Sequence, residues 1–264
     1  MNADFLTRRI AKPLVFLLCL LPALWLVAAI FALQTGAIAW WQPTSLGANP
    51  VEKIQDTLGI WGLRLLLLTL AVTPIRTVGG WPRLLAFRRM LGLFAFFYIV
   101  LHFLWYLFVD QEFDWEQLFA DVVKRPFITA GFTAFLLLVP LAMTSTKVAM
   151  RRLGRRWQKL HRLVYVAAIL GCVHFWWQVK ADIREPAVYA GIAAVLLGWR
   201  LWRRWRPRRR VVDPASTALT RGAGTEGNPA EDQQAAGAGA PAHLFAEQPP
   251  AQRRGEHWLA HGDD

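Results

Sequence analysis

Long apolar stretches constrain the fold of this chain more than any other feature of its sequence. A membrane hydrocarbon core of about 30 Å is crossed by roughly 20 apolar residues in a helix. Six stretches approach that length: Leu14–Leu33, Leu58–Ile75, Leu91–Val109, Pro126–Met143, His161–Gln178 and Ala187–Trp202. The sequence therefore predicts an all-α, polytopic membrane protein with a six-helix transmembrane bundle.

The first stretch follows basic residues and could pass for a signal peptide. Its length and the sequence Trp40-Trp41 after it do not fit a cleaved segment with small residues at its end, so we expect a retained helix.

The segments between the stretches alternate in charge. Twenty Lys and Arg residues fall in the first segment, the second and fourth loops and the segment from Arg200 to Arg210, against five in the other loops. Because Lys- and Arg-rich loops stay in the cytoplasm, both termini are predicted to be cytoplasmic, and most arginine runs to serve topology. The acidic segment 110–116 is predicted to lie outside. Basic residues between apolar runs also argue against a nucleic-acid binder, despite a net charge of +12.

Composition divides the chain into three predicted parts. Residues 1–13 form a cytoplasmic N-terminus, residues 14–202 the six-span domain, and residues 203–264 a tail that is first basic and then low in complexity. The tail is too poor in apolar residues to form a core, so we expect it to be disordered. Cys19 and Cys172 lie within apolar runs and are expected to be small core residues, without a disulfide framework.

Two histidines within the spans carry the functional argument, because ionisable groups in a membrane are costly. His102 lies roughly 16 Å along its helix from the cytoplasmic start of the third stretch, and His174 roughly 20 Å along the fifth. Imidazoles at similar depth on helices of the same direction are typical of a bundle that holds a b-type haem. Zinc would need further Cys, Asp or Glu ligands, and interhelical hydrogen bonding is the simpler alternative.

Other polar residues near the spans leave two interpretations each. His161, beside Arg162, suits either the membrane interface or a cofactor. Arg64, about one turn inside the outer end of the second stretch, either extends to the interface or pairs with an anion such as a haem propionate. Tyr98 and Tyr106 lie four residues on either side of His102 and are expected to pack against a ring.

Four motifs carry a resemblance to a known family. They read RRMLGLFAFFYIVLHFLWY (Arg88–Tyr106), KRPFITAGFTAFLLLVPLAMTS (Lys124–Ser145), RRLGRRWQKLHRLVYVAAILGCVHFWW (Arg151–Trp177) and GIWGLRLLLLTLAVTPIR (Gly59–Arg76). Together they resemble the haem-binding membrane subunit of the bacterial periplasmic protein-methionine-sulfoxide reductase system, the MsrQ (YedZ) family. The resemblance extends from about Leu14 to Trp202.

This resemblance implies a multi-pass protein of the bacterial inner membrane that belongs to the ferric-reductase-like fold. It implies haem b, FMN, and electron delivery to a periplasmic molybdenum-containing methionine-sulfoxide reductase subunit. The haem-ligating histidines of the family correspond to His102, His161 and His174.

Two departures from the wider superfamily matter. That superfamily places two histidines 13–14 residues apart on each of two helices. Here Arg88 or Arg89 holds the inner place before His102, so the number of haems, one or two, stays open. No G-x-G-x-x-G motif follows the membrane domain, so electrons must come from membrane quinone or a separate cytoplasmic flavin reductase.

The chain shows no nucleophile–base pair and no carboxylate dyad, so we expect an electron-transfer subunit whose catalytic centre lies on the partner. One alternative is a free-standing ferric or quinone-linked reductase of the same fold. Another is a small transporter with incidental histidines, which would be colourless and would usually carry an internal repeat; the sequence shows none to inspection.

Overall fold

The computed structural model describes residues 7–35, 46, 49–179 and 182–205, and within these ranges the chain is helical and has no strand. The long helices are α2 (Lys12–Thr35), α3 (Pro50–Gly79), α4 (Leu85–Trp105), α6 (Pro126–Met143), α9 (Leu163–Gln178) and α10 (Arg184–Trp205). Short helices complete them: η1 (Thr7–Ala11), η2 (Pro82–Leu84), η3 (Tyr106–Asp110), α5 (Trp115–Lys124), α7 (Lys147–Leu153) and α8 (Arg155–Leu160). Almost all of the tail 203–264 lies outside the described residues.

Five helical segments in the described part are long and apolar enough to cross a membrane. They are Arg9–Thr35, Pro50–Gly79, Pro82–Asp110, Pro126–Met143 and Arg155–Gln178. The predicted sixth span is present as α10, a helix of 22 residues. Arg200, Arg203 and Arg204 dilute its apolar character, so the six-span count and the orientation stay predictions.

Local sequence explains where the helices begin and end. Asn49 caps α3 by accepting a hydrogen bond from the Glu52 amide at 3.3 Å, and Pro50 occupies the first turn, where no amide donor is needed. Gly80 ends α3 with φ +68°, a left-handed conformation that favours glycine. Asp114 caps α5 in the same way through the Gln117 amide, at 3.0 Å.

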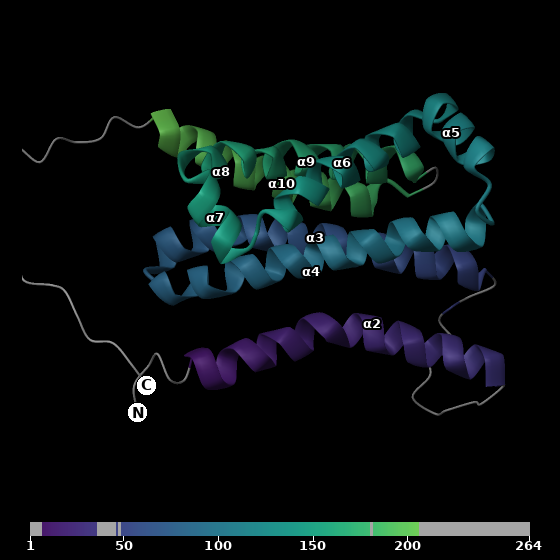
Figure 1. Ribbon diagram of the computed structural model, residues 1–264, viewed down its shortest axis with the longest axis horizontal. Coiled ribbons are helices and arrows are strands. Elements are labelled where there is room, and N and C mark those ends of the chain that lie inside the picture. Colours follow the sequence, from purple (N-terminus) through teal and green to yellow (C-terminus); the bar gives the residue numbers. More distant parts are fainter. Residues whose placement is uncertain (1–6, 36–45, 47–48, 180–181, 206–264) are drawn as a thin grey trace, which may run out of the picture. The chain divides into compact units, whose positions relative to one another are not determined.

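Helix α3 forms the centre of the packing. It lies along α4 over most of its length and also contacts α2, α9 and α10, while α6 pairs with α9 (Figure 1). The leucines in the middle of α3 are buried: Leu63, Leu65, Leu66, Leu67 and Leu70. Helix α2, in contrast, exposes large apolar side chains along much of its length, as expected of a helix that faces lipid.

Tyr98 of α4 fastens α2 to the bundle. Its side chain is fully buried, and its hydroxyl donates to the Cys19 carbonyl at 2.7 Å and accepts from the Ala23 amide at 3.0 Å. Those two groups would bond each other in an uninterrupted helix, but Pro22 stands beside them in α2. The hydroxyl therefore completes a helical ladder that the proline disturbs.

One local expectation needs correction. Helix α9 begins at Leu163 and not at His161, because His161 and Arg162 form a turn between α8 and α9. Around this turn the Arg162, Val164 and Tyr165 amides bond to the third residue before each, which tightens the chain.

We predict that Tyr98→Phe loosens α2 specifically. The Ala23 amide and Cys19 carbonyl would lose their buried partner, at a cost of about 1–3 kcal/mol in the free energy of unfolding. Hydrogen exchange of residues 19–26 in the purified protein should accelerate. Tyr106→Phe, on the same helical segment but bonded elsewhere, should leave that exchange unchanged; equal exchange in both variants would refute the role of Tyr98.

Candidate functional site

The structure brings His102 of α4 and His174 of α9 together. Their ring centroids lie 6.1 Å apart and the ring planes cross at 79°. The residues are far apart in sequence and lie on helices that run in the same direction, as the depth argument required. The pair is therefore a real cluster within the helical core.

Each imidazole is held by a backbone carbonyl of a neighbouring helix. The His102 Nδ1–H donates to the Gln55 carbonyl of α3 at 2.9 Å, and the His174 Nδ1–H donates to the Phe127 carbonyl of α6 at 2.7 Å. A carbonyl can only accept, so in both neutral rings the proton is on Nδ1 and Nε2 keeps its lone pair. This is the arrangement in which histidines commonly bind metals.

A glycine makes room for each ring. Gly59 and Gly131 lie four residues after Gln55 and Phe127, one helical turn along the same face. A Cβ on Gly59 would lie 3.0 Å from His102 Cε1, and one on Gly131 would lie 2.7 Å from His174 Nδ1. Neither glycine was predicted from the sequence. The available signal was that each glycine precedes its histidine by the same number of residues.

These matching contacts reveal an internal repeat. Each hydrogen bond spans 47 residues, and the two histidines are 72 positions apart (174 − 102). The same shift superposes further identical residues of the α3–α4 pair on the α6–α9 pair: Thr57 on Thr129, Ala95 on Ala167, Phe103 on Phe175 and Trp105 on Trp177. We did not see this repeat in the sequence, because its identical residues are few and scattered along the two helix pairs. Both copies direct one histidine to the same place, so the repeat accounts for the pair and does not favour a transporter.

Aromatic side chains of α4 and α6 pack against one another, and one of them contacts the histidine pair. Phe103 stacks on Phe135 at 4.8 Å between ring centroids, and Phe135 is parallel to Phe96 at 6.2 Å. Phe127 lies 6.2 Å from the His174 ring. Phe127 therefore contacts His174 twice, through its carbonyl and through its ring.

The pair fits an iron porphyrin better than a simple metal ion. The ring centres are 6.1 Å apart, and both rings keep Nε2 free of the backbone bonds that hold Nδ1. Within the described residues no three His, Cys, Asp or Glu side chains gather as a metal site. A zinc ion needs three or four protein ligands, whereas a haem iron needs two.

His161 lies apart from this pair, at the turn between α8 and α9. Its ring stacks on Trp157 at 3.9 Å, and its Nδ1–H donates to the Trp157 carbonyl at 3.2 Å. The Trp157 indole in turn donates to the Thr144 carbonyl at 2.9 Å. His161 is thus positioned by α8 and by the end of α6.

The structure separates the two arginines that compete for the place facing His161. Arg88 is half-buried and close enough to His161 and Arg200 for its positive charge to repel a positive charge on either, whereas Arg89 is exposed. By the repeat, however, Arg89 is the counterpart of His161, since each lies 13 residues before the paired histidine of its helix pair. The position equivalent to His161 therefore carries an exposed guanidinium.

Two arginines connect α10 to α3. The Arg64 Nε–H donates to the Tyr189 hydroxyl at 2.7 Å, and its guanidinium lies 5.2 Å from the Trp61 ring centre. At the other end, Arg200 donates to the Leu70 carbonyl at 2.5 Å. The contact between Arg64 and Tyr189 was not foreseen from the sequence, and neither was the role of Arg200.

The C-terminal end of α4 is closed by a buried carboxylate. Asp121 of α5 is 5% exposed and accepts from the Tyr106 hydroxyl at 3.0 Å and from the Gln111 side-chain Nε2–H at 3.3 Å. Arg125 pairs with its second oxygen at 3.2 Å. Tyr106 thus serves to fix α5, and like Tyr98 it uses its hydroxyl away from the histidines. Around it, Asp110, Glu112, Asp114 and Glu116 are exposed.

We predict that Gly131→Ala displaces the His174 ring. The new methyl would overlap the imidazole, so the ring must rotate and lose its bond to Phe127, and the separation of the two imidazoles must change. The pair's affinity for an added iron porphyrin, followed by absorption in the purified protein, should fall by about tenfold or more.

Gly171→Ala is the matched control on the helix of His174. There an added Cβ meets only Leu63 Cδ1, at an ordinary 3.6 Å. Equal affinity in the wild type and in Gly131→Ala would show that the glycine does not position the ring.

Comparison with known proteins gives consistent results. The family described as "Ferric reductase like transmembrane component" matches residues 58–172. The chain is 58% identical over 168 residues to the "Protein-methionine-sulfoxide reductase heme-binding subunit MsrQ" of Xanthomonas campestris pv. campestris (strain 8004), covering 64% of this chain and 77% of that protein. It is 48% identical over 213 residues to the protein of the same description from Polaromonas naphthalenivorans, covering 79% of this chain and 92% of the relative.

Proposed function

Because the chain belongs to the MsrQ family of haem-binding subunits of protein-methionine-sulfoxide reductases, we propose that it is the membrane cytochrome of such a system. In this proposal it resides in the bacterial inner membrane and passes electrons outward to a periplasmic, molybdenum-containing reductase subunit. The convergence of two Nδ1-anchored imidazoles carries the proposal.

His102 and His174 would be the axial ligands of one b-type haem. The bound haem would supply one-electron chemistry. The chain's own residues supply the rest: Gln55 and Phe127 hold the ring tautomers, Gly59 and Gly131 admit the rings, and Phe127 places an aromatic ring beside His174. Holding both imidazoles in place before and after electron transfer keeps the reorganisation small, because little of the site has to move.

The inner end is proposed as the place of electron entry. His161 and the half-buried Arg88 would contribute to a second cofactor site there, for a further haem or for FMN, with the guanidinium paired to acidic groups. FMN rests on the family resemblance alone. The exposure of Arg89 favours a single bis-histidine haem. Membrane quinone or a cytoplasmic flavin reductase would be the donor.

Of the two roles expected for Arg64, the proposal adopts pairing with a haem propionate. A guanidinium has five N–H donors, and the bond to Tyr189 uses one of them. The contact with α10 would then hold the remaining donors in a fixed orientation.

The matched substitutions His102→Ala, His174→Ala and His161→Ala test this division. Either outer variant should lose the low-spin haem spectrum, because one axial ligand is gone. His161→Ala should retain it while slowing reduction from quinol or a flavin reductase. Absorption spectra of the purified variants, with a pyridine-haem assay, show whether the protein is a cytochrome and how many haems each chain binds.

An unchanged Soret band and full haem content in both outer variants would contradict the ligand assignment. A colourless wild type would favour the transporter alternative. The match to ferric reductase like components keeps a free-standing reductase as a second candidate, which would be favoured if no periplasmic subunit co-purified.

We further predict that the exposed acids near α5 guide the partner. Replacing Asp110, Glu112, Asp114 and Glu116 by their amides should slow electron transfer to the reductase several-fold at low salt, and less at high salt. Asparagine at position 114 retains the cap of α5. The control is Asp182→Asn with Glu185→Gln, two exposed acids before α10 and early in it; a rate that no replacement alters would exclude this docking surface.

A further inference from the structure

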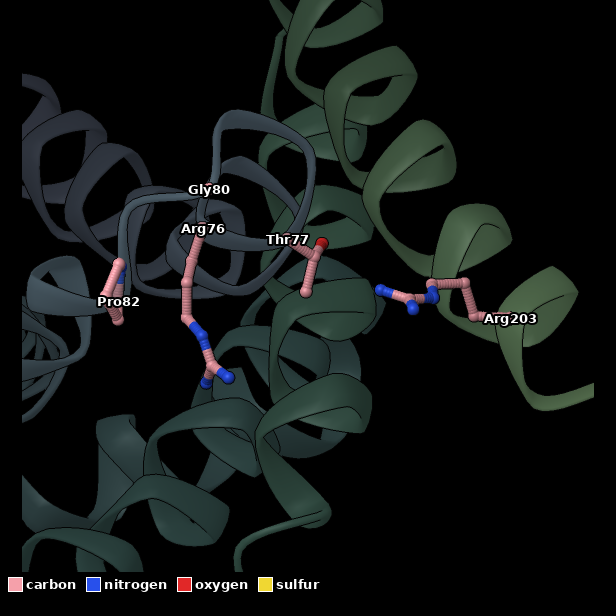
Figure 2. A pocket seen from close by; sticks show the side chains of 5 residues that line it. All are labelled: Arg76, Thr77, Gly80, Pro82 and Arg203. Carbon is pink, nitrogen blue, oxygen red and sulfur yellow. The ribbon is translucent and has the colours of Figure 1, made fainter. Parts of the chain in front are cut away.

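A cavity of about 300 Å³ opens between the predicted cytoplasmic ends of α3 and α10. It is lined by Arg76, Thr77, Gly80, Pro82 and Arg203. In Figure 2, Arg203 reaches from α10 toward Thr77, while Arg76 extends from the last turn of α3. We name this the Arg76/Arg203 pocket. It is separate from the paired histidines, and nothing in the proposed electron path uses it.

The positive charge of the pocket is not balanced by carboxylates of the neighbouring helices. No Asp or Glu occurs in residues 57–109, 122–181 or 186–212, which include the inner ends of α3, α4, α6, α9 and α10. In the part of the chain that the structure describes, no carboxylate forms an ion pair with Arg76 or Arg203. Since guanidinium stays charged at any physiological pH, the counter-ion must come from outside the helices.

Topology alone would not place these arginines together. A positive-inside bias requires basic residues near the span ends, but it does not require two of them, from distant segments, to line one cavity. Arg203 is also steadied by the Trp199 ring, 5.1 Å from its guanidinium. Two arginines from distant segments that line one cavity, one of them held by an aromatic ring, are features of a binding site.

The lining also restricts the ligand. The Thr77 hydroxyl donates to the Thr73 and Pro74 carbonyls, and Pro82 has no amide hydrogen. The guanidiniums are thus the donors that these side chains offer, and their planar forks suit phosphate oxygens. Val78 and Trp81, beside the pocket, are 80% and 62% exposed, as expected at the level of lipid headgroups.

We propose that the Arg76/Arg203 pocket binds a phosphate group, supplied by an anionic phospholipid of the inner leaflet or by free phosphate. Basic pockets between helices at a cytoplasmic membrane face commonly hold lipid headgroups. Such a ligand would join α3 to α10 at the end where Arg200 already connects them.

The full chain, purified in detergent, is titrated with phosphatidylglycerol and lipid binding is measured by native mass spectrometry. Arg76→Gln with Arg203→Gln is compared with Arg83→Gln plus Arg204→Gln, which removes the same charge from exposed arginines outside the pocket. The pocket variant should lose about tenfold more affinity than the control. In a second arm, inorganic phosphate is added to protein in phosphatidylcholine nanodiscs and thermal unfolding is followed.

If the pocket variant, but not the control, loses phosphatidylglycerol binding, the lipid is the source of the phosphate group. If instead the pocket variant loses only its stabilisation by inorganic phosphate, the source is free phosphate. Equal losses in pocket and control variants would mean general surface attraction and would overturn the proposal, as would a wild type that binds neither. If the glutamine pair does not fold, Arg76→Lys with Arg203→Lys keeps the charge but removes the fork, and it should still bind more weakly than the control.

Discussion

In the apolar interior of a helical bundle, an imidazole N–H needs an acceptor, and the acceptors at hand are helix carbonyls. Those of Gln55 and Phe127 accept from His102 and His174 while remaining in their helices. This bond fixes the tautomer, the ring orientation and the direction of Nε2 together. The proposed haem site depends on it, since an unanchored histidine could adopt several rotamers and either tautomer.

The same bond explains why the helices pair as they do. A ring can reach a helical carbonyl only where no side chain covers it, and Gly59 and Gly131 provide that gap. α4 must therefore pack closely on α3, and α9 on α6, which are the most extensive pairings in the described chain. The repeat accounts for the pair, because one helix pair used twice gives two imidazoles that face each other.

The two ends of the bundle differ in charge and in construction. At the outer end, Asp121 gathers Tyr106, Gln111 and Arg125 and fixes α5 beneath a group of exposed acids. At the inner end arginines meet backbone carbonyls, aromatic rings and the Arg76/Arg203 pocket. This polarity agrees with the proposed outward path of electrons, toward a partner met at an acidic surface.

The sequence alone determined that the chain is a polytopic helical membrane protein and which two histidines lie at similar depth, because hydrophobic length and helical rise are local properties. It also limited the candidate histidines to His102, His174 and His161 by the scarcity of ionisable groups. It did not reveal Gly59, Gly131 or the carbonyl acceptors, since an unremarkable glycine gains its role only from the ring packed against it. The tertiary structure likewise decided that Tyr98 and Tyr106 bond to Cys19 and Asp121, that Arg88 and not Arg89 is half-buried, and that Arg76 and Arg203 line one pocket. Each of these depends on the rotation of one helix against another, which is set by packing over the whole interface and by no single segment.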